Sequence, residues 1–147
     1  MITTSVGTAR PIRTIAAATA SVGLAVVLTA VGTSEPFRDS DVAPDWSGWT
    51  AFNLPIILGS AVLVFGFVHR VVQRGRPSIV RSAVVLAVLS VLSLSVPWTG
   101  LPCVLAGGAI LAAHEATSHE TRRAAPTAAL GLAVATVAGA VAAALFG

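Results

Sequence analysis

The stretch IVRSAVVLAVLSVLSLSVPWTGLPCVLAGGAILAA, residues 79–113, decides the fold of this chain. Its 35 residues contain one charged side chain, Arg81, close to the start. A single α-helix of this length would be about 52 Å long, whereas the hydrocarbon core of a bilayer is about 30 Å thick. The sequence PWTGLP at 97–102 interrupts the run, because Pro and Gly both favour turns. We therefore predict a tight hairpin between two membrane helices, residues 78–96 and a shorter one at 100–113.

Three further apolar runs flank this hairpin, at residues 14–32, 54–72 and 127–146. The first contains no charged residue and would span roughly 28 Å as a helix, close to the thickness of the hydrocarbon core. The runs together predict an all-α fold, a polytopic membrane helix bundle of about five transmembrane helices. All 147 residues would then form one integral membrane domain.

Two helix ends can be predicted from local sequence. Asn53 is a candidate N-cap for the second helix, which would place Pro55 in the first turn, where a missing N–H costs nothing. No residue breaks the fourth helix after Ala113. We therefore expect it to continue as a solvated extension through Arg123, until Pro126.

The composition excludes a soluble domain. Of the 147 residues, 55% are hydrophobic and 10% are charged, and the mean hydropathy is +0.87. Soluble domains contain about 25% charged residues, because they need a polar surface. All nine basic residues are Arg, which is typical of a GC-rich bacterial gene, and we expect the chain in the bacterial inner (cell) membrane. The single Cys103 excludes an intrachain disulfide.

The arginines predict how the helices are oriented. With five spans and a cytoplasmic N-terminus, eight arginines lie on the inner side and only Arg38 lies outside, as the positive-inside rule requires. If the fourth span did not cross the membrane, only six arginines would lie on the inner side and three would lie outside. We therefore predict a cytoplasmic N-terminus and an extracytoplasmic C-terminus. The eight inner arginines are Arg10, Arg13, Arg70, Arg74, Arg76, Arg81, Arg122 and Arg123.

The first apolar run has an alternative interpretation as a cleaved signal peptide. Basic residues precede it, and Ala30-Val31-Gly32 has the small residues of a cleavage site. However, the run is longer than the usual apolar region of 7–15 residues, and another span follows soon after it. We favour a first helix that is retained.

Four arginines, Arg70, Arg74, Arg76 and Arg81, form the strongest candidate binding surface. They lie within twelve residues at the predicted cytoplasmic face, where each would attract anionic lipid headgroups by about 1 kcal/mol. The alternative is that they only fix the topology, and the two roles are compatible. The net charge of +3 would also suit nucleic acid, but arginines at the ends of apolar runs favour the membrane interpretation, so we predict no nucleic-acid partner.

The sequence HEATSHE at 114–120 resembles a zinc-binding His-Glu-x-x-His motif only superficially. That motif needs two histidines four residues apart on one helix face, whereas His114 and His119 are five apart. Asp39, Asp41 and Asp45 lack the Gly and Glu of a calcium-binding EF-hand loop. We therefore predict no metal site and no cofactor.

The predicted spans contain few groups for chemistry. No Asp, Glu, Lys or Arg lies near the centre of any span, which argues against ion-coupled transport and against catalysis within the bilayer. We therefore predict no catalytic residue. The hydroxyl side chains in the spans are expected to bond to their own helix or to a neighbouring one. These residues are Ser60, Ser90, Ser93, Ser95 and Thr136.

Small residues recur at four-residue intervals in two of the predicted helices. Ala17, Ser21 and Ala25 follow this spacing in the first, and Gly131, Ala135 and Gly139 follow it in the fifth. Such faces allow membrane helices to approach one another closely. The fifth helix is the better candidate for packing, because glycine weakens a helix unless the packing uses it.

These observations favour one class of function over two others. The first hypothesis is a non-enzymatic accessory, assembly or self-oligomerising membrane component, whose partner is another membrane protein or a second copy of the chain. The alternative is a small uncoupled permease or a channel-like protein built from several copies. A third hypothesis is an enzyme that acts on lipid headgroups through His69, His114 or His119.

Overall fold

The computed structural model describes residues 9–33, 46–74, 76–96, 99–117 and 124–146. They form five α-helices and one short 3-10 helix, with no strand in the described ranges, so the predicted all-α bundle is confirmed. The elements, in chain order, are α1 (Ala9–Thr33), α2 (Trp46–Arg74), α3 (Arg76–Leu92), η1 (Ser93–Ser95), α4 (Leu101–Thr117) and α5 (Ala124–Phe146).

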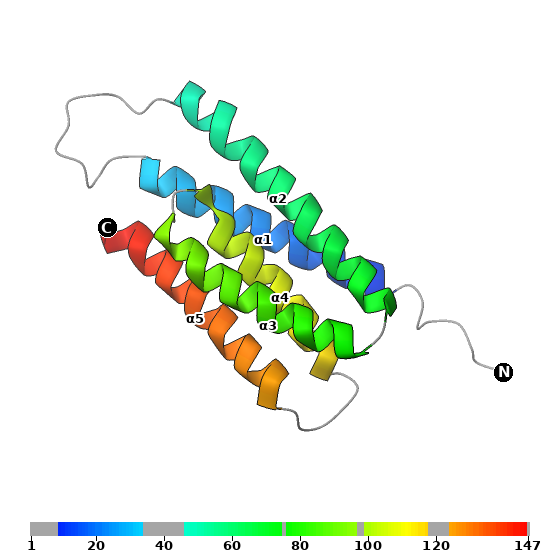
Figure 1. Ribbon diagram of the computed structural model, residues 1–147. Helices are drawn as coiled ribbons and strands as arrows, with labels where there is room; N and C mark the ends of the chain where they lie inside the picture. The colour runs from blue at the N-terminus through cyan, green and yellow to red at the C-terminus, as the bar shows by residue number, and fades with distance from the viewer. Residues whose placement is uncertain (1–8, 34–45, 75, 97–98, 118–123, 147) are drawn as a thin grey trace.

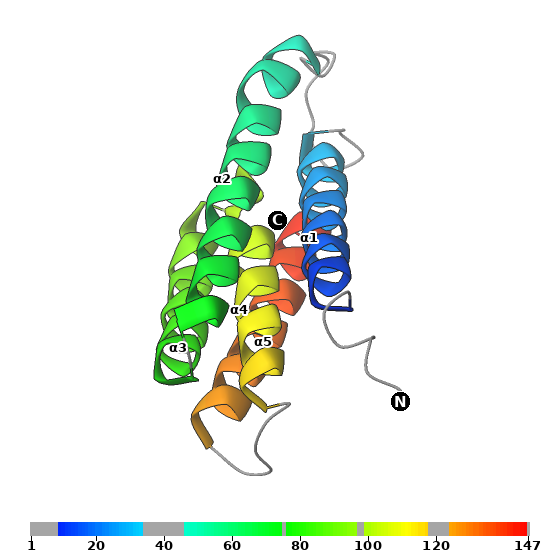
Figure 2. The same ribbon diagram turned by 90° about the vertical axis from the view of Figure 1, so that its right-hand side faces the viewer.

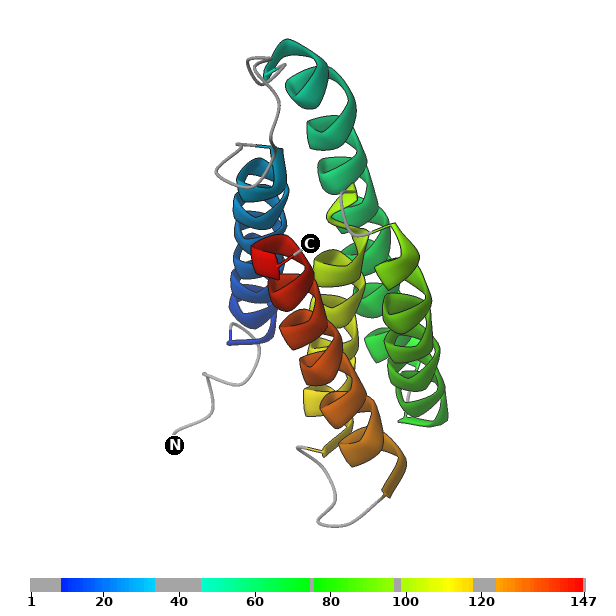
Figure 3. The same ribbon diagram turned by 90° about the vertical axis from the view of Figure 1, so that its left-hand side faces the viewer.

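The helices run in alternating directions along the bundle, with α4 at its centre. Figure 1 shows that consecutive helices run in opposite directions. Figures 2 and 3 show α1, α2, α3 and α5 surrounding α4. The contacts agree with this view, because α4 packs against each of the other four α-helices. The helix α4 therefore holds the bundle together.

Four of the five helices are long and apolar enough to cross a membrane. Their apolar segments are Ile12–Val31, Trp46–Arg74, Pro77–Ser95 and Ala124–Leu145. The helix α4 has 17 residues, about 25 Å at 1.5 Å per residue. The helix α3 has as many, but its apolar segment continues through η1 to Ser95, so the α4 segment is the shortest of the five, as predicted.

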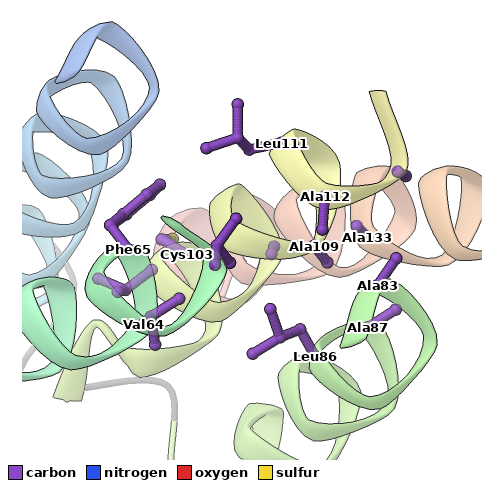
Figure 4. Packing of buried hydrophobic residues seen from close by; sticks show 14 of the residues in the cluster. Val64, Phe65, Ala83, Leu86, Ala87, Cys103, Ala109, Leu111, Ala112 and Ala133 are labelled. Carbon is purple, nitrogen blue, oxygen red and sulfur yellow. The ribbon is translucent and has the colours of Figure 1, made fainter. Parts of the chain in front are cut away.

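Many large apolar side chains lie on the outside of the bundle, and alanines are frequent inside it. Phe52 is 73% exposed, Val62 73% and Leu63 74%, whereas Ala83, Ala106 and many other alanines are almost fully buried. Figure 4 shows alanines of α3, α4 and α5 facing one another beside a few larger side chains. Because a bilayer solvates the large apolar groups, this distribution is the one that membrane insertion requires.

Two adjacent glycines allow α4 to approach its neighbours closely. A Cβ on Gly107 would lie 2.8 Å from Ser21 Cβ of α1 and would also overlap the Ser21 hydroxyl. A Cβ on Gly108 would overlap Val64 of α2 and lie 3.5 Å from Leu86 Cδ1 of α3. Because α4 has no side chain at these two positions, Ser21 and Val64 pack directly against its backbone, and the helix packing at the centre depends on both glycines.

The hairpin before α4 turns at a buried glycine. Gly100 has a φ of +71°, and a Cβ there would lie 2.9 Å from Ile57 Cγ1 and 3.1 Å from Ala25 Cβ. The backbone N–H of Leu101 donates to Thr99 Oγ1 at 3.4 Å, as expected of a capping hydroxyl. The turn was predicted from its Pro and Gly residues, of which Pro97 lies outside the described residues.

The second helix begins earlier than the capping signal predicted. It starts at Trp46, so Asn53 is not its N-cap and Pro55 lies inside the helix. Pro55 is the tenth residue of α2, where it removes one backbone donor, and its exposed ring lies on the outside of the bundle. Thr50 Oγ1 also donates to the Trp46 carbonyl at 2.9 Å, within the added turns.

The ends of α4 and α5 also refine the prediction. The helix α4 ends at Thr117 within the described residues, and residues 118–123 of the expected extension lie outside them. The helix α5 begins at Ala124, so Pro126 lies in its first turn instead of preceding it. A proline is compatible with this position, because the first N–H groups of a helix have no intrahelical acceptor.

Candidate functional site: the arginine-rich end and the outer helix faces

Arginines from neighbouring helices meet at one end of the bundle, which we call the arginine-rich end. The helix α2 ends at Arg74, and α3 begins two residues later (Figure 1). Arg70, Arg74 and Arg81 are all exposed, and no described residue forms an ion pair with any of them. Arg76 is the first residue of α3, and its side chain lies outside the described side chains.

The geometry of this end leaves the guanidinium groups available to ligands from outside the chain. Arg74 lies in the last turn of α2, where a positive charge also interacts favourably with the helix dipole. Arg81 lies one turn into the apolar segment of α3, so its long side chain must extend toward the polar interface. An arrangement of this kind suits phosphate-bearing headgroups, to which guanidinium groups bind in bidentate fashion.

The three histidines do not come together in the described residues. His69 is exposed near the end of α2, where its Nε2 lies 3.1 Å from Gln73 Nε2 of the same helix. His114 is exposed near the end of α4, and His119 lies outside the described residues. No group of three or more His, Cys, Asp or Glu side chains that could hold a metal ion occurs in the part of the chain that the structure describes.

The opposite end carries an aromatic pair at the start of α2. The rings of Trp46 and Trp49 meet edge to face, with centroids 6.3 Å apart and an interplanar angle of 72°. Trp46 is 45% exposed, which suits a residue at the membrane interface. The acidic residues Asp39, Asp41 and Asp45, from the preceding segment, lie outside the described residues.

The two small-residue faces have different surroundings. On α1, Ser21 and Ala25 are buried and contribute to the contact with α4. On α5, Gly131 and Ala135 are exposed, and a Cβ on Gly131 would have no atom within 4 Å. Gly139 is half-buried, and a Cβ there would lie 3.6 Å from Leu94 Cδ1.

The helix α5 therefore uses another face for packing inside the chain. The residues that it buries in the bundle include Ala129, Ala133, Thr136 and Ala140. The stripe of Gly131 and Ala135 remains on the outside, where it is available to lipid or to another helix. Packing through these two residues stays a prediction, and it would require a second chain.

Hydroxyl side chains bond to their own helices, as the sequence predicted, and one pair joins two helices. Ser90 Oγ lies 2.7 Å from the Ala87 carbonyl oxygen and 3.2 Å from Thr136 Oγ1, so its single proton is donated to one or the other, while Thr136 Oγ1 donates to the Leu132 carbonyl at 2.9 Å. Ser90 is 0% exposed and Thr136 1% exposed. This contact between α3 and α5 is buried in the apolar interior, where polar pairs help membrane helices to associate.

One acidic residue was not identified as a site from sequence. Glu115, near the end of α4, is only 8% exposed and is the one buried charged side chain among the described residues. Its neighbours in sequence, His114 and Thr117, are exposed, so the sequence pattern alone resembles an ordinary solvated helix end. The burial of Glu115 becomes visible only when α4 is placed at the centre of the bundle.

Comparisons of the sequence and the structure with protein-family models, with curated proteins and with solved structures gave no match. The functional argument therefore depends on the features described above.

Proposed function

We propose that this protein is a multi-pass component of the bacterial inner (cell) membrane that works by association with other membrane proteins, and first of all with a second copy of itself. The observation that carries the proposal is the outer face of α5. Gly131 and Ala135 are exposed there, although the same helix packs into its own bundle through a separate face. Glycine in a helix interior costs about 1 kcal/mol relative to alanine, unless a close helix contact uses it.

The centre of the bundle favours this function over transport by one chain. The helix α4 occupies the centre, and its residues Ala106, Ala109 and Ala113 are 0% exposed. A permease or channel would therefore need a path between copies of the chain instead of through one copy. Such a path would itself depend on self-association.

The arginine-rich end supports a second part of the proposal, contact with anionic headgroups on the cytoplasmic side. Arg70, Arg74 and Arg81 are exposed together at this end and have no acidic partner among the described residues. An anionic leaflet would attract them and would hold the cytoplasmic N-terminus and the extracytoplasmic C-terminus in the proposed orientation.

Disulfide cross-linking in native membranes tests the proposed self-association. Cys103, buried in α4, is first replaced by Ala, and Ala135→Cys then places one thiol on the outer face of α5. Val62→Cys, on an exposed position of α2, is the matched control. We expect oxidation to give a dimer with Ala135→Cys and not with Val62→Cys. A chain that stays monomeric with both thiols would overturn the proposal.

A further inference from the structure

The hairpin between α3 and α4 lies deeper in the bundle than the helix ends around it. A Cβ on Gly100 would contact Ile57 of α2 and Ala25 of α1, so the hairpin is level with these two residues. From that level α2 extends eleven residues further, to Trp46, and α1 extends eight residues further, to Thr33. These lengths correspond to about 16 Å and about 12 Å of helix.

The helix α5 also extends past the hairpin. A Cβ on Gly139 would lie 3.6 Å from Leu94 Cδ1, in η1 at the end of α3. The helix α5 continues for seven residues beyond Gly139, to Phe146, which is about 10 Å of helix. In Figure 1 the ends of α1, α2 and α5 on this side of the bundle all lie beyond the hairpin.

At the arginine-rich end, by contrast, α2 and α3 become polar at the same level. A Cβ on Gly108 would approach both Val64 of α2 and Leu86 of α3, so these two residues are level with each other. Five residues from each of them toward the arginine-rich end are His69 and Arg81, which are both exposed. The two antiparallel helices therefore share one polar boundary at this end.

The helix α5 reaches the same boundary. Ser90 Oγ of α3 and Thr136 Oγ1 of α5 lie 3.2 Å apart, so these residues are level. Nine residues from each of them toward the arginine-rich end are Arg81 and Thr127, which is also exposed. Polar side chains at one level on several helices mark the edge of the hydrocarbon core.

The exposed apolar face of α3 is consequently shorter than that of α2. It lies between Arg81 and Ser95, which are both exposed, and measures about 22 Å when the longer rise of η1 is included. The apolar face of α2 lies between the exposed residues Thr50 and His69 and measures about 28 Å. Since the two faces share their boundary at the arginine-rich end, the missing length is at the hairpin end.

The side chains of the α3 face indicate that lipid covers it. Close packing between membrane helices requires small residues, and those of α3 point into the bundle. The buried small residues are Ser82, Ala83, Ala87 and Ser90. The exposed face between Arg81 and Ser95 carries only valine and leucine: Val84, Val85, Val88, Leu89, Val91 and Leu92.

The protein has little freedom to relieve this mismatch by itself. A membrane helix that is too short is accommodated by long flanking side chains, by association or by a thinner bilayer. Ser95 is too short to reach outward, and its hydroxyl donates to the Leu92 carbonyl at 2.9 Å. Tilting α3 alone would break its packing against α4 and α5. The bilayer must therefore adapt.

We propose that the exposed face of α3 is a lipid-binding surface that thins the bilayer beside it by about 6 Å, in the leaflet at the hairpin end. This is the outer leaflet in the orientation proposed above. The face selects phospholipids with short or disordered acyl chains and brings their headgroups closer to the centre of the bilayer. The inference depends on membrane insertion and not on self-association of the chain.

Depth measurements on spin-labelled protein test this surface. The full-length Cys103→Ala protein receives one nitroxide label, at Leu92→Cys of α3 or Leu58→Cys of α2, and is reconstituted into vesicles of phosphatidylethanolamine and phosphatidylglycerol. The two residues are exposed, and each lies six residues beyond the level of Leu86 and Val64. Collision rates with oxygen and with a water-soluble nickel chelate give the depth of each label. We expect residue 92 to lie about 6 Å closer to the headgroups than residue 58.

A second pair of labels is the matched control near the arginine-rich end. Val84→Cys of α3 and Phe67→Cys of α2 are exposed positions within about 1.5 Å of the same level. They should lie at equal depth below the headgroups of the other leaflet, because the two helices share their boundary there. If residue 84 is deeper than residue 67 by about 6 Å, the whole bundle is tilted in a flat bilayer, and the proposal is wrong.

Two further results would overturn the proposal. Equal depths at residues 92 and 58 would show a bilayer of uniform thickness around the bundle. A label at residue 92 that neither oxygen nor the nickel chelate reaches would show that another protein chain, and not lipid, covers the α3 face. This second result would leave the proposed self-association standing, so the two proposals can fail independently.

Discussion

Replacing Gly107 with alanine should separate α1 from α4. The new Cβ would lie 2.8 Å from Ser21 Cβ and would overlap the Ser21 hydroxyl. Ser21 cannot move aside easily, because it is 8% exposed and its hydroxyl donates to the Ala17 carbonyl at 2.7 Å. The helices must therefore move apart by about 1 Å to restore an ordinary carbon–carbon contact of about 3.8 Å.

Two opposing effects set the change in unfolding free energy that Gly107→Ala causes. Overpacking of a close contact costs about 1–3 kcal/mol, while alanine favours the helix over glycine by about 1 kcal/mol. The overlap at Gly107 involves Ser21 Cβ, which the α1 backbone holds in place, and not the end of a flexible side chain. We therefore take about 2–3 kcal/mol as the cost of overpacking. The expected net loss is about 1–2 kcal/mol of unfolding free energy.

The assay is denaturation by SDS in mixed micelles, followed by circular dichroism of the helices. Gly66→Ala on α2 is the matched control, because a Cβ there would have no atom within 4 Å. It should be as stable as the wild type or slightly more stable. Adding Ser21→Gly to Gly107→Ala removes both overlapping atoms and should restore most of the loss. The reasoning is refuted if Gly107→Ala and Gly66→Ala prove equally stable.

The remaining predictions concern single bonds and charges. Ser90→Ala should lose about 0.6–1.7 kcal/mol in the same assay, because it removes the contact with Thr136 of α5 as well as the bond to the Ala87 carbonyl of its own helix. Ser95→Ala removes only a bond to the Leu92 carbonyl and should lose less; equal losses would contradict this. Changing Arg70, Arg74 and Arg81 together to Gln should reduce binding of the purified protein to anionic lipid by about 1 kcal/mol per charge at low salt, and unchanged binding would limit these residues to a topological role. Replacing His114 and His119 by Gln should leave metal content and membrane abundance unchanged; a stoichiometric zinc that disappears in this variant would favour an enzyme instead.

The fold could be predicted from sequence because apolar length and turn residues are local signals. The run at 79–113 is too long for one span, and Gly100 marks where it must turn. The start of α2 was missed for a related reason. The turns from Trp46 to Asn53 resemble a polar loop with a cap, and only the continuous helix shows that they belong to α2.

The packing faces could not be predicted, because an alanine-rich helix offers several equivalent stripes. On α5, the spacing of Gly131 and Ala135 equals the spacing of Ala129 and Ala133, yet only the second pair is buried in the chain. Sequence spacing shows that a close approach is available and does not show which helix uses it. The burial of Glu115 depends in the same way on α4 being central, which is a tertiary property.

The central claim is that five helices cross one bilayer in alternating directions, with the arginine-rich end in the cytoplasm. Labelling of single cysteines at Ser40, Ser78 and Ala124 by a membrane-impermeant thiol reagent, in a Cys103→Ala background, tests this most directly. We predict that the thiol at residue 40 reacts in intact cells, and that those at 78 and 124 react only after the membrane is opened. Labelling of residue 124 from outside would show that α4 does not cross, and equal labelling of residues 40 and 78 would contradict the whole topology.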